Sequence, residues 1–394
     1  MENNLVIDKK KINKILDLLN ERRMNKLHVL NSALAECSFA ELEVLYTKLP
    51  PLFKGLFSLS YLKRKDYSSI FQTTIQLNLD AIDYFGKVAY IIKRNSSILK
   101  DYIIRKRRVD ELFFVGDYEN ALIEIHNINR EISYSYWASS YEIMIERLTN
   151  GKSSAISLHN NLYNKNNSFW FGKFCNAAYY TSSLEVTSKE SQDLVYVKED
   201  NTNAKIINQI IKDHFYGFDN PEIAGWLCID FKSSIIDIYN NFIHYLPLVP
   251  QKIKDNVQFR EYIQVVAIST EDPFVKFLLR LWGSSKSQQQ VSAARLKIIN
   301  SYLTTNYSEV IELASIYVKQ RENCFCFDIL FCYLNSLIKT NQDLPELDKD
   351  ASIYDRVKFH LFNVLRKNDS TYHLHKLKGI CQSIFNIFEI TILS

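Results

Sequence analysis

The sequence predicts an all-α protein built from stacked antiparallel helical hairpins. Only 9 glycines and 7 prolines occur in 394 residues, well below their usual shares of about 7% and about 5%. Apolar residues recur at spacings of three and four, as on helices that bury one face. Nearly half of the residues are apolar, so the chain can form a sizeable core and is not expected to be disordered.

The first part of the chain carries several helical patterns. Apolar periodicity predicts helices over 8–35, 39–49, 68–92 and 97–114. Ser38, followed by Glu41, has the pattern of a capping box at the start of the second helix, and Pro50-Pro51 should end it. After a break at Gly116-Asp117, helices are predicted over 118–131, 135–148, 153–163 and 169–184.

A polar stretch over 185–203 is the best candidate for a linker. Its run Leu194–Val197 is β-like and predicts at most a short edge strand. We therefore expect an N-terminal helical domain over 1–184 and a C-terminal helical domain over 204–394. In the second domain, helices are predicted over 204–215, 221–231, 233–246, 252–268, 273–282, 288–305, 307–321, 323–339, 353–367 and 372–392.

Two distant segments share one pattern of apolar residues. Tyr118, Ala121, Leu122, Ile125 and Ile128 line up with Tyr307, Val310, Ile311, Ala314 and Tyr317. The correspondence extends upstream, where Val109 and Phe113 match Ile298 and Tyr302. It also extends downstream, where Trp137, Tyr141, Met144 and Leu148 match Phe327, Phe331, Leu334 and Ile338. Here the separation between matched positions is one residue longer than in the earlier part. The sequence therefore predicts a repeated module of three helices.

Gly116-Asp117-Tyr118, followed by Ala121 and Leu122, resembles the Gly-x-Tyr-x-x-Ala-Leu phrase of tetratricopeptide repeats. The second copy departs from this phrase at Asn306 and Val310, and no regular spacing of about 34 residues runs through the chain. The resemblance implies an irregular α-solenoid with a concave surface that binds a protein or peptide. An irregular helical protein with a chance repeat is the alternative.

The main enzyme motifs are missing from the sequence. It has no phosphate-binding loop, dinucleotide fingerprint, nucleophile elbow or His-Glu-x-x-His pair. We therefore expect no catalytic residues, no cofactor and no metal. Arg23 with His28, and Arg366 with His373, resemble the Arg-x4-6-His phrase of HEPN ribonucleases. A cryptic nuclease or hydrolase is therefore kept as a second alternative.

Two clusters invite a metal interpretation. Cys324-x-Cys326, with Cys332 nearby, lacks the Cys-x2-Cys spacing of zinc sites and has the apolar neighbours typical of buried thiols. The second cluster is His373-x-His375, with His360 and Cys381 in the neighbourhood. Helical ligands would need a spacing of three or four residues, so surface histidines are the simpler interpretation.

The strongest charge feature is a basic segment over 93–108, in which Asp101 is the one opposing charge. Its cations could bind phosphates, and Tyr90 and Tyr102 could stack on bases. A nucleic-acid-binding protein is therefore the first alternative, against a solvated helix face partly neutralised by Asp110-Glu111. The candidate residues are Lys93, Arg94, Lys100, Arg105, Lys106, Arg107 and Arg108.

The rest of the composition gives expectations for the cellular compartment of the protein and for its partners. Seven cysteines, an odd number, suggest reduced thiols and a cytoplasmic protein. No apolar run reaches the roughly 20 residues that span a membrane. Abundant Asn, Ile, Lys, Tyr and Phe suggest AT-rich codons and a bacterial or phage gene. We expect a non-catalytic scaffold or sensor that binds another protein or peptide, in a bacterial anti-phage defence system; its oligomeric state stays open.

Overall fold

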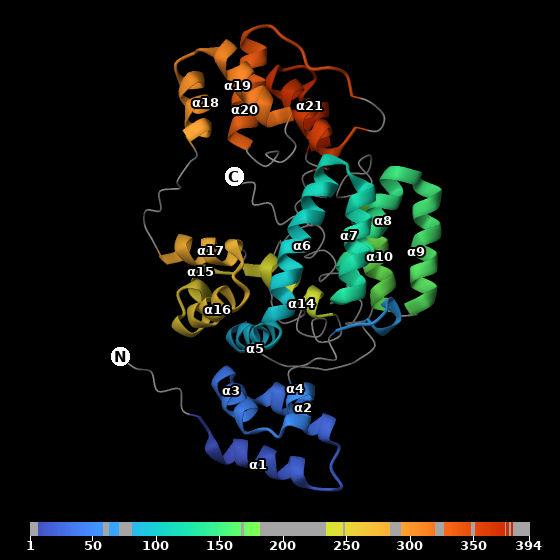
Figure 1. Ribbon diagram of the computed structural model, residues 1–394, viewed down its shortest axis with the longest axis vertical. Coiled ribbons are helices and arrows are strands. Elements are labelled where there is room, and N and C mark those ends of the chain that lie inside the picture. The colour runs from blue at the N-terminus through green and yellow to red at the C-terminus, as the bar shows by residue number, and fades with distance from the viewer. Residues whose placement is uncertain are drawn as a thin grey trace.

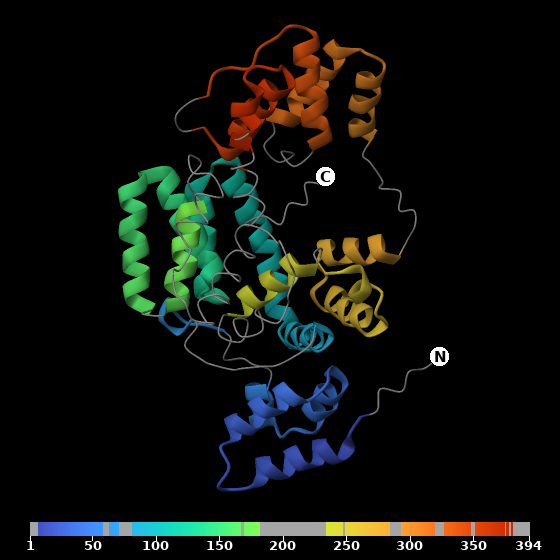
Figure 2. The ribbon, with the colours of Figure 1, turned by 180° about the vertical axis from the view of Figure 1, so that it is seen from behind.

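The computed structural model describes residues 7–57, 63–70, 81–166, 169–181, 234–246, 249–283, 293–319, 327–347, 351–374, 376–377 and 380. Every regular element within these ranges is a helix, which confirms the predicted all-α fold class. Consecutive helices pack as hairpins, in three groups along the longest axis of the molecule (Figure 1; Figure 2 from behind). The expected linker at 185–203, the strand at 194–197 and the helices over 204–215 and 221–231 lie outside the described residues.

The first group lies at one end of the molecule. It comprises α1 (Lys9–Asn20), α2 (Lys26–Glu36), α3 (Phe39–Lys48) and α4 (Pro51–Phe57). The single helical pattern predicted over 8–35 is wrong, because the chain turns after Asn20 and Asn25 caps a new helix by accepting a hydrogen bond from the His28 N–H at 3.3 Å. The capping box of Ser38 and Glu41 is confirmed at the start of α3.

The central group is the largest. It contains η2 (Tyr67–Ser69), α5 (Ala81–Arg94), α6 (Ser96–Val115), α7 (Tyr118–Glu131), α8 (Tyr136–Asn150), α9 (Lys152–Asn166), α10 (Phe169–Thr181), α14 (Ile235–Tyr245), α15 (Gln251–Lys254), α16 (Val257–Thr270) and α17 (Pro273–Gly283). Helices α14 and α16 pack against α5 and α6. The regions before and after the expected linker therefore share one hydrophobic core, while the proposed division into two domains stays a prediction.

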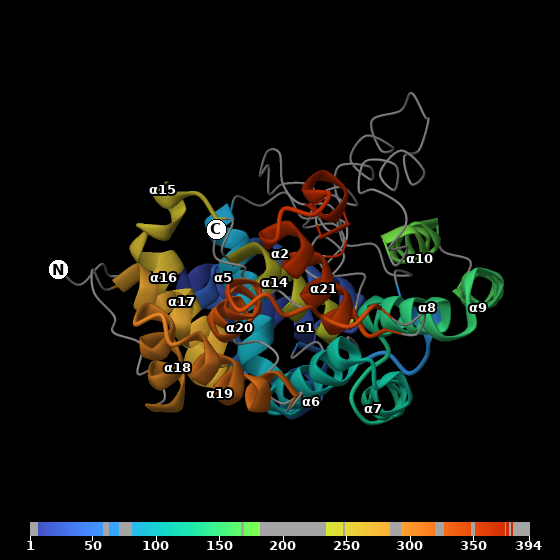
Figure 3. The ribbon, with the colours of Figure 1, turned by 90° about the horizontal axis from the view of Figure 1, so that it is seen from above.

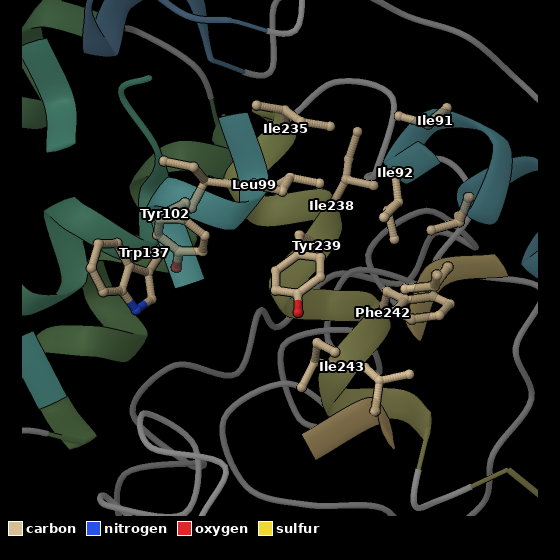
Figure 4. Packing of buried hydrophobic residues seen from close by; sticks show 14 of the residues in the cluster. Ile91, Ile92, Leu99, Tyr102, Trp137, Ile235, Ile238, Tyr239, Phe242 and Ile243 are labelled. Atoms are coloured by element: carbon tan, nitrogen blue, oxygen red, sulfur yellow. The ribbon is translucent and has the colours of Figure 1, made fainter. Parts of the chain in front are cut away.

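Aromatic side chains fill the centre of this core. The Tyr102 ring lies between those of Trp137 and Tyr239, with centroids 5.4 and 6.3 Å away (Figure 4). Phe85 packs edge-on against Phe242 at 6.0 Å, and both are fully buried. Such edge-to-face pairs stabilise a core beyond the area they bury, so α14 joins α5, α6 and α8 into one unit.

The last group comprises α18 (Ala293–Leu303), α19 (Tyr307–Lys319), α20 (Phe327–Lys339) and α21 (Ile353–Leu365). The first three helices enclose a small core of their own, formed by Ile298, Val310, Ala314, Ile329 and Cys332. Helix α21 packs against both α20 and α6, and it lies beside α20 when the molecule is seen from above (Figure 3). Among the described helices, none is both long and apolar enough to cross a membrane.

Candidate functional site

The two segments that share a sequence pattern also share a turn. We call α6–α8 the first module and α18–α20 the second module. In the first, Gly116 is left-handed (φ 83°), its N–H donates to the Phe113 carbonyl at 3.1 Å, and the next N–H donates to the Leu112 carbonyl at 2.9 Å. In the second, Thr305 is left-handed (φ 60°), with the equivalent hydrogen bonds at 3.0 and 2.9 Å. Both helices therefore end in the same C-terminal turn.

Side chains around the two turns also correspond. The Phe113 and Tyr118 rings meet at 5.6 Å and 60°, and the Tyr302 and Tyr307 rings at 6.0 Å and 62°. Along α7 and α19, the four matched pairs whose side chains are described are buried to a similar degree: Tyr118, Ala121, Leu122 and Ile125 against Tyr307, Val310, Ile311 and Ala314. Before the turn, Phe113 is buried while Tyr302 is only partly buried. The side chain of Tyr317 lies outside the described ones. The repeated three-helix module predicted from sequence thus has a common geometry at its first turn.

The correspondence weakens along the third helix of each module. Met144 and Leu334 are both buried, but Tyr141 is 1% exposed while Phe331 is 39% exposed. The match of Phe331 with Tyr141 is therefore wrong, because α20 buries Leu330, Leu334 and Leu337 and turns Phe331 outward. The Phe327 side chain lies outside the described ones.

Most cations of the basic segment are paired with carboxylates. Glu43 of α3 accepts from Lys93 at 2.6 Å and from Arg94 at 2.5 Å. Lys100 meets Glu271 at 2.5 Å, at the end of α16. These partners belong to distant helices, so the basic segment links α5 and α6 to α3 and α16.

The next two cations of the basic segment are also paired. Arg105 binds Glu131 of α7 at 2.7 Å, and Lys106 binds Asp110 at 3.2 Å. Arg107 and Arg108 differ, because both are exposed and neither is within salt-bridge distance of a carboxylate among the described residues. The structure therefore leaves two of the seven candidate cations available to a ligand.

The arginine–histidine pairs do not share a helical face. Arg23 lies in the turn between α1 and α2, whereas His28 lies in α2. Arg366 ends α21, and His373 lies in the following helical turn. There the Nδ1 atoms of His360 and His373 are 2.8 Å apart. The one-helix arrangement that the ribonuclease phrase needs is therefore not formed.

The predicted metal candidates are only partly described. Cys324, Cys326, His375 and Cys381 lie outside the described residues, and Cys332 is buried. Within the described part of the chain, no three His, Cys, Asp or Glu side chains converge as metal ligands would. The His360–His373 pair is the one contact that the sequence pattern anticipated.

A buried acid in the first module was missed by the sequence analysis. Glu142 of α8 is 8% exposed. Its Oε1 accepts hydrogen bonds from the Tyr67 hydroxyl at 2.7 Å and from the Asn129 amide at 3.2 Å, and the exposed His126 lies 3.6 Å away. Burial raises the pKa of Glu142 to about 7. The sequence did contain a signal for this buried acid, because Glu142 stands among apolar residues in a segment predicted to be helical.

A second buried acid joins two helices. Asp237 of α14 accepts hydrogen bonds from the Tyr136 and Trp137 N–H groups, both at 3.1 Å, and from Ser234. It therefore caps α8 as well as its own helix, where a negative charge is favourable. Burial raises the pKa of Asp237 to about 7, against the lowering effect of these hydrogen bonds. This acid has a structural role in holding α14 on α8.

The chain matches no protein-family model, no curated protein and no solved structure at a significant level. The features of the chain itself that point to a function are the repeated turn, the exposed apolar side chains of the second module and the buried acid Glu142.

Proposed function

We propose that this protein is a non-catalytic interaction scaffold or sensor, and that its partner is another protein or a peptide. The observation that supports this role is the three-helix module that occurs twice with the same turn. Helical hairpins that repeat in this way form extended surfaces that suit the binding of proteins and peptides. The resemblance of the first module to tetratricopeptide repeats agrees with this proposal.

The second module offers the surface best suited to a partner. Four of its large apolar side chains are exposed: Leu296 (46%), Leu303 (71%), Ile316 (52%) and Phe331 (39%). The positions matched to the first two in the first module are Arg107, which is charged, and Phe114, which is covered by Tyr354 of α21 with ring centroids 5.5 Å apart. The first module exposes two such apolar side chains, Ile104 and Ile123, and the second exposes four. We therefore propose that the second module provides the binding face.

A displayed library of random peptides tests this proposal directly. We expect peptides that bind the intact chain to lose at least tenfold in affinity, about 1.4 kcal/mol, on Leu296→Asp with Ile316→Asp. Ile123→Asp, an exposed position of the first module (51%), is the matched control and should leave binding unchanged. Peptides that bind all three proteins equally, or a library without binders, would contradict the proposal.

Binding of nucleic acid is the alternative that one observation favours. Arg107 and Arg108 are exposed and have no carboxylate partner among the described residues. Filter binding of RNA and DNA at several salt concentrations distinguishes this function, because phosphate contacts weaken steeply with salt. Binding lost in Arg107→Glu with Arg108→Glu, but kept in Lys152→Glu, supports the alternative. No binding at low salt excludes it.

We also propose that the protein acts in the cytoplasm, within a bacterial anti-phage defence system. The amino-acid composition and the cysteine content support this setting. Neighbouring genes that encode a nuclease or an ATPase of such a system would support it. Neighbours of purely metabolic function would argue against it.

A further inference from the structure

The hydrogen bonds around Glu142 leave one buried acceptor without a donor. The Asn129 amide nitrogen donates to the Tyr67 hydroxyl at 3.0 Å and to Glu142 at 3.2 Å. These bonds fix the orientation of the amide, since its oxygen would be repelled by the carboxylate. Asn129 is 4% exposed, and none of the described residues donates to its Oδ1. Among the described residues the cluster therefore lacks one proton donor, and an unsatisfied buried oxygen is costly.

The second module provides an internal comparison for this cluster. The positions of α19 that correspond to His126 and Asn129 of α7 are Ser315 and Val318. The second module forms the same first turn and buries Cys332 within its core. The polar cluster is therefore not required to build such a module, and its cost in the first module calls for a function.

Glu142 faces titratable groups from four neighbouring elements. These are Tyr67 of η2, His126 of α7, Lys165 of α9 and Cys175 of α10. The carboxyl of Asp237, from α14, is bound to the backbone at the start of α8. Tyr67 and Cys175 are neutral near pH 7, because burial raises the pKa of each. Burial raises the pKa of both Glu142 and Asp237 to about 7, so of these buried groups the two carboxyls are the ones that can change charge near neutral pH.

We propose that Glu142 is protonated while residues 63–70 cover it, and that loss of this proton loosens the hold of residues 63–70 on the first module. Protonation supplies the missing donor, because the Glu142 hydroxyl can donate to the Asn129 Oδ1 after a small rotation. Residues 63–70 are the element that covers the acid, through Tyr67. Loss of the proton leaves a buried charge, which is relieved when this segment moves away and water reaches the carboxylate.

The segment is held by hydrogen bonds and by the buried side chains of Tyr67 and Ile70, and the proton on Glu142 acts directly on one of these attachments, the Tyr67 hydroxyl. The Arg64 N–H donates to the Ser133 hydroxyl at 2.8 Å, and the Tyr134 N–H donates to the Arg64 carbonyl at 3.1 Å. Asn166 donates to the Ile70 carbonyl at 3.0 Å. The pKa of Glu142 is about 7 when covered and lies near 4.5 when exposed. The attached state therefore binds the proton more tightly than the open state. Its stability falls as pH rises from about 4.5 to about 7, and above that the covered carboxyl is itself ionised.

Hydrogen exchange of the intact chain tests this regulation. After correction for the intrinsic pH effect, the opening equilibrium at the Arg64 and Tyr134 amides should increase about tenfold between pH 6 and pH 8. Glu142→Gln keeps the shape and an acceptor but cannot ionise, so it should abolish this increase. Glu146→Gln, one helical turn further on, is the matched control and should behave as the wild type.

Two further results decide the proposal. The His126→Gln variant should keep the pH dependence of the opening equilibrium. If the pH dependence disappears in this variant, His126 causes the effect and the proposal is overturned. The wild-type carboxyl should titrate near neutral pH in a carbon NMR experiment, a test that holds even if Glu142→Gln fails to fold. Asp237 also has a raised pKa, so the signal that decides is that of a glutamate side-chain carboxyl. An unchanged pH dependence in Glu142→Gln, or no glutamate carboxyl that titrates near pH 7, would overturn the proposal.

Discussion

Asp237 shows how one buried side chain can fix the position of two helices. Its carboxylate accepts hydrogen bonds from Tyr136 and Trp137 of α8 and from Ser234, the N-cap of α14. Asp117, in contrast, caps α7 alone, by accepting from the Asn120 N–H at 3.4 Å. The two aspartates therefore differ in the number of donors that depend on them.

Asp237→Ala should lower the free energy of unfolding by about 3 kcal/mol, because it leaves three buried N–H groups without an acceptor. Asp117→Ala should cost about 1 kcal/mol, the usual effect of a lost N-cap. Urea denaturation of both variants measures the difference. Equal losses would contradict the double-capping role of Asp237.

His360 should make the protein sensitive to acid. Burial lowers its pKa to about 4, with His373, Lys376 and Arg356 adding to the effect. The unfolded chain, in which the pKa is near 6.5, then binds the proton more tightly, so stability falls as pH drops from about 6.5 to 4. His360→Gln should reduce this loss in thermal melts at pH 7 and pH 5, whereas the exposed His28→Gln should not. The same loss in both variants would show that other groups cause it.

Single residues of the candidate site were the hardest to predict from sequence. Glu142 lies far along the chain from Tyr67, and only the packing of η2 on α8 brings them within 2.7 Å. The partners of the basic segment were missed for the same reason, since Glu43 and Glu271 come from distant helices. The burial of a side chain and its ion-pair partners depend on tertiary contacts. The spacing of residues along the sequence does not reveal these contacts.

Local signals predicted helices better than they predicted helix breaks. The bounds of α7, Tyr118–Glu131, agree with those predicted, because Asp117 starts the helix and Gly116 ends the one before. The break before α2 was missed, although Asn25 is a good N-cap. The helix predicted over 252–268 is likewise interrupted, and α16 starts at Val257 after the cap Asn256. In both cases apolar periodicity continued across a break marked by a single asparagine.

The two matched turns should respond in opposite ways to substitution. Gly116→Ala forces a side chain into a left-handed position and places its Cβ 2.9 Å from Ser352, the N-cap of α21. It should destabilise the protein by about 2 kcal/mol. Thr305→Gly removes a β-branched residue from the same left-handed conformation. This variant should stabilise the protein by up to about 1 kcal/mol. Thermal denaturation checks both signs, and a destabilised Thr305→Gly would contradict the left-handed turn.

The arrangement of the helical groups depends on a few connecting elements. Helix α14 joins the central core, the paired cations of α5 and α6 reach α3 and α16, and α21 joins the second module to α6. The sequence predicted the all-α class, but not this assembly. The contacts of α14, the Lys100–Glu271 pair and the contact of α21 with α6 join residues on opposite sides of 185–203, where a linker had been expected to separate two domains.

The repeated module is the claim on which the scaffold proposal depends. Spin labels at Arg108 and Asn150 report the first module, and labels at Lys297 and Thr340 occupy the matched positions of the second. Labels carried by unnatural amino acids leave the buried cysteines unchanged. Pulsed electron paramagnetic resonance should give the same distance distribution for both pairs. Clearly different mean distances would show that the two segments fold differently and would contradict the account.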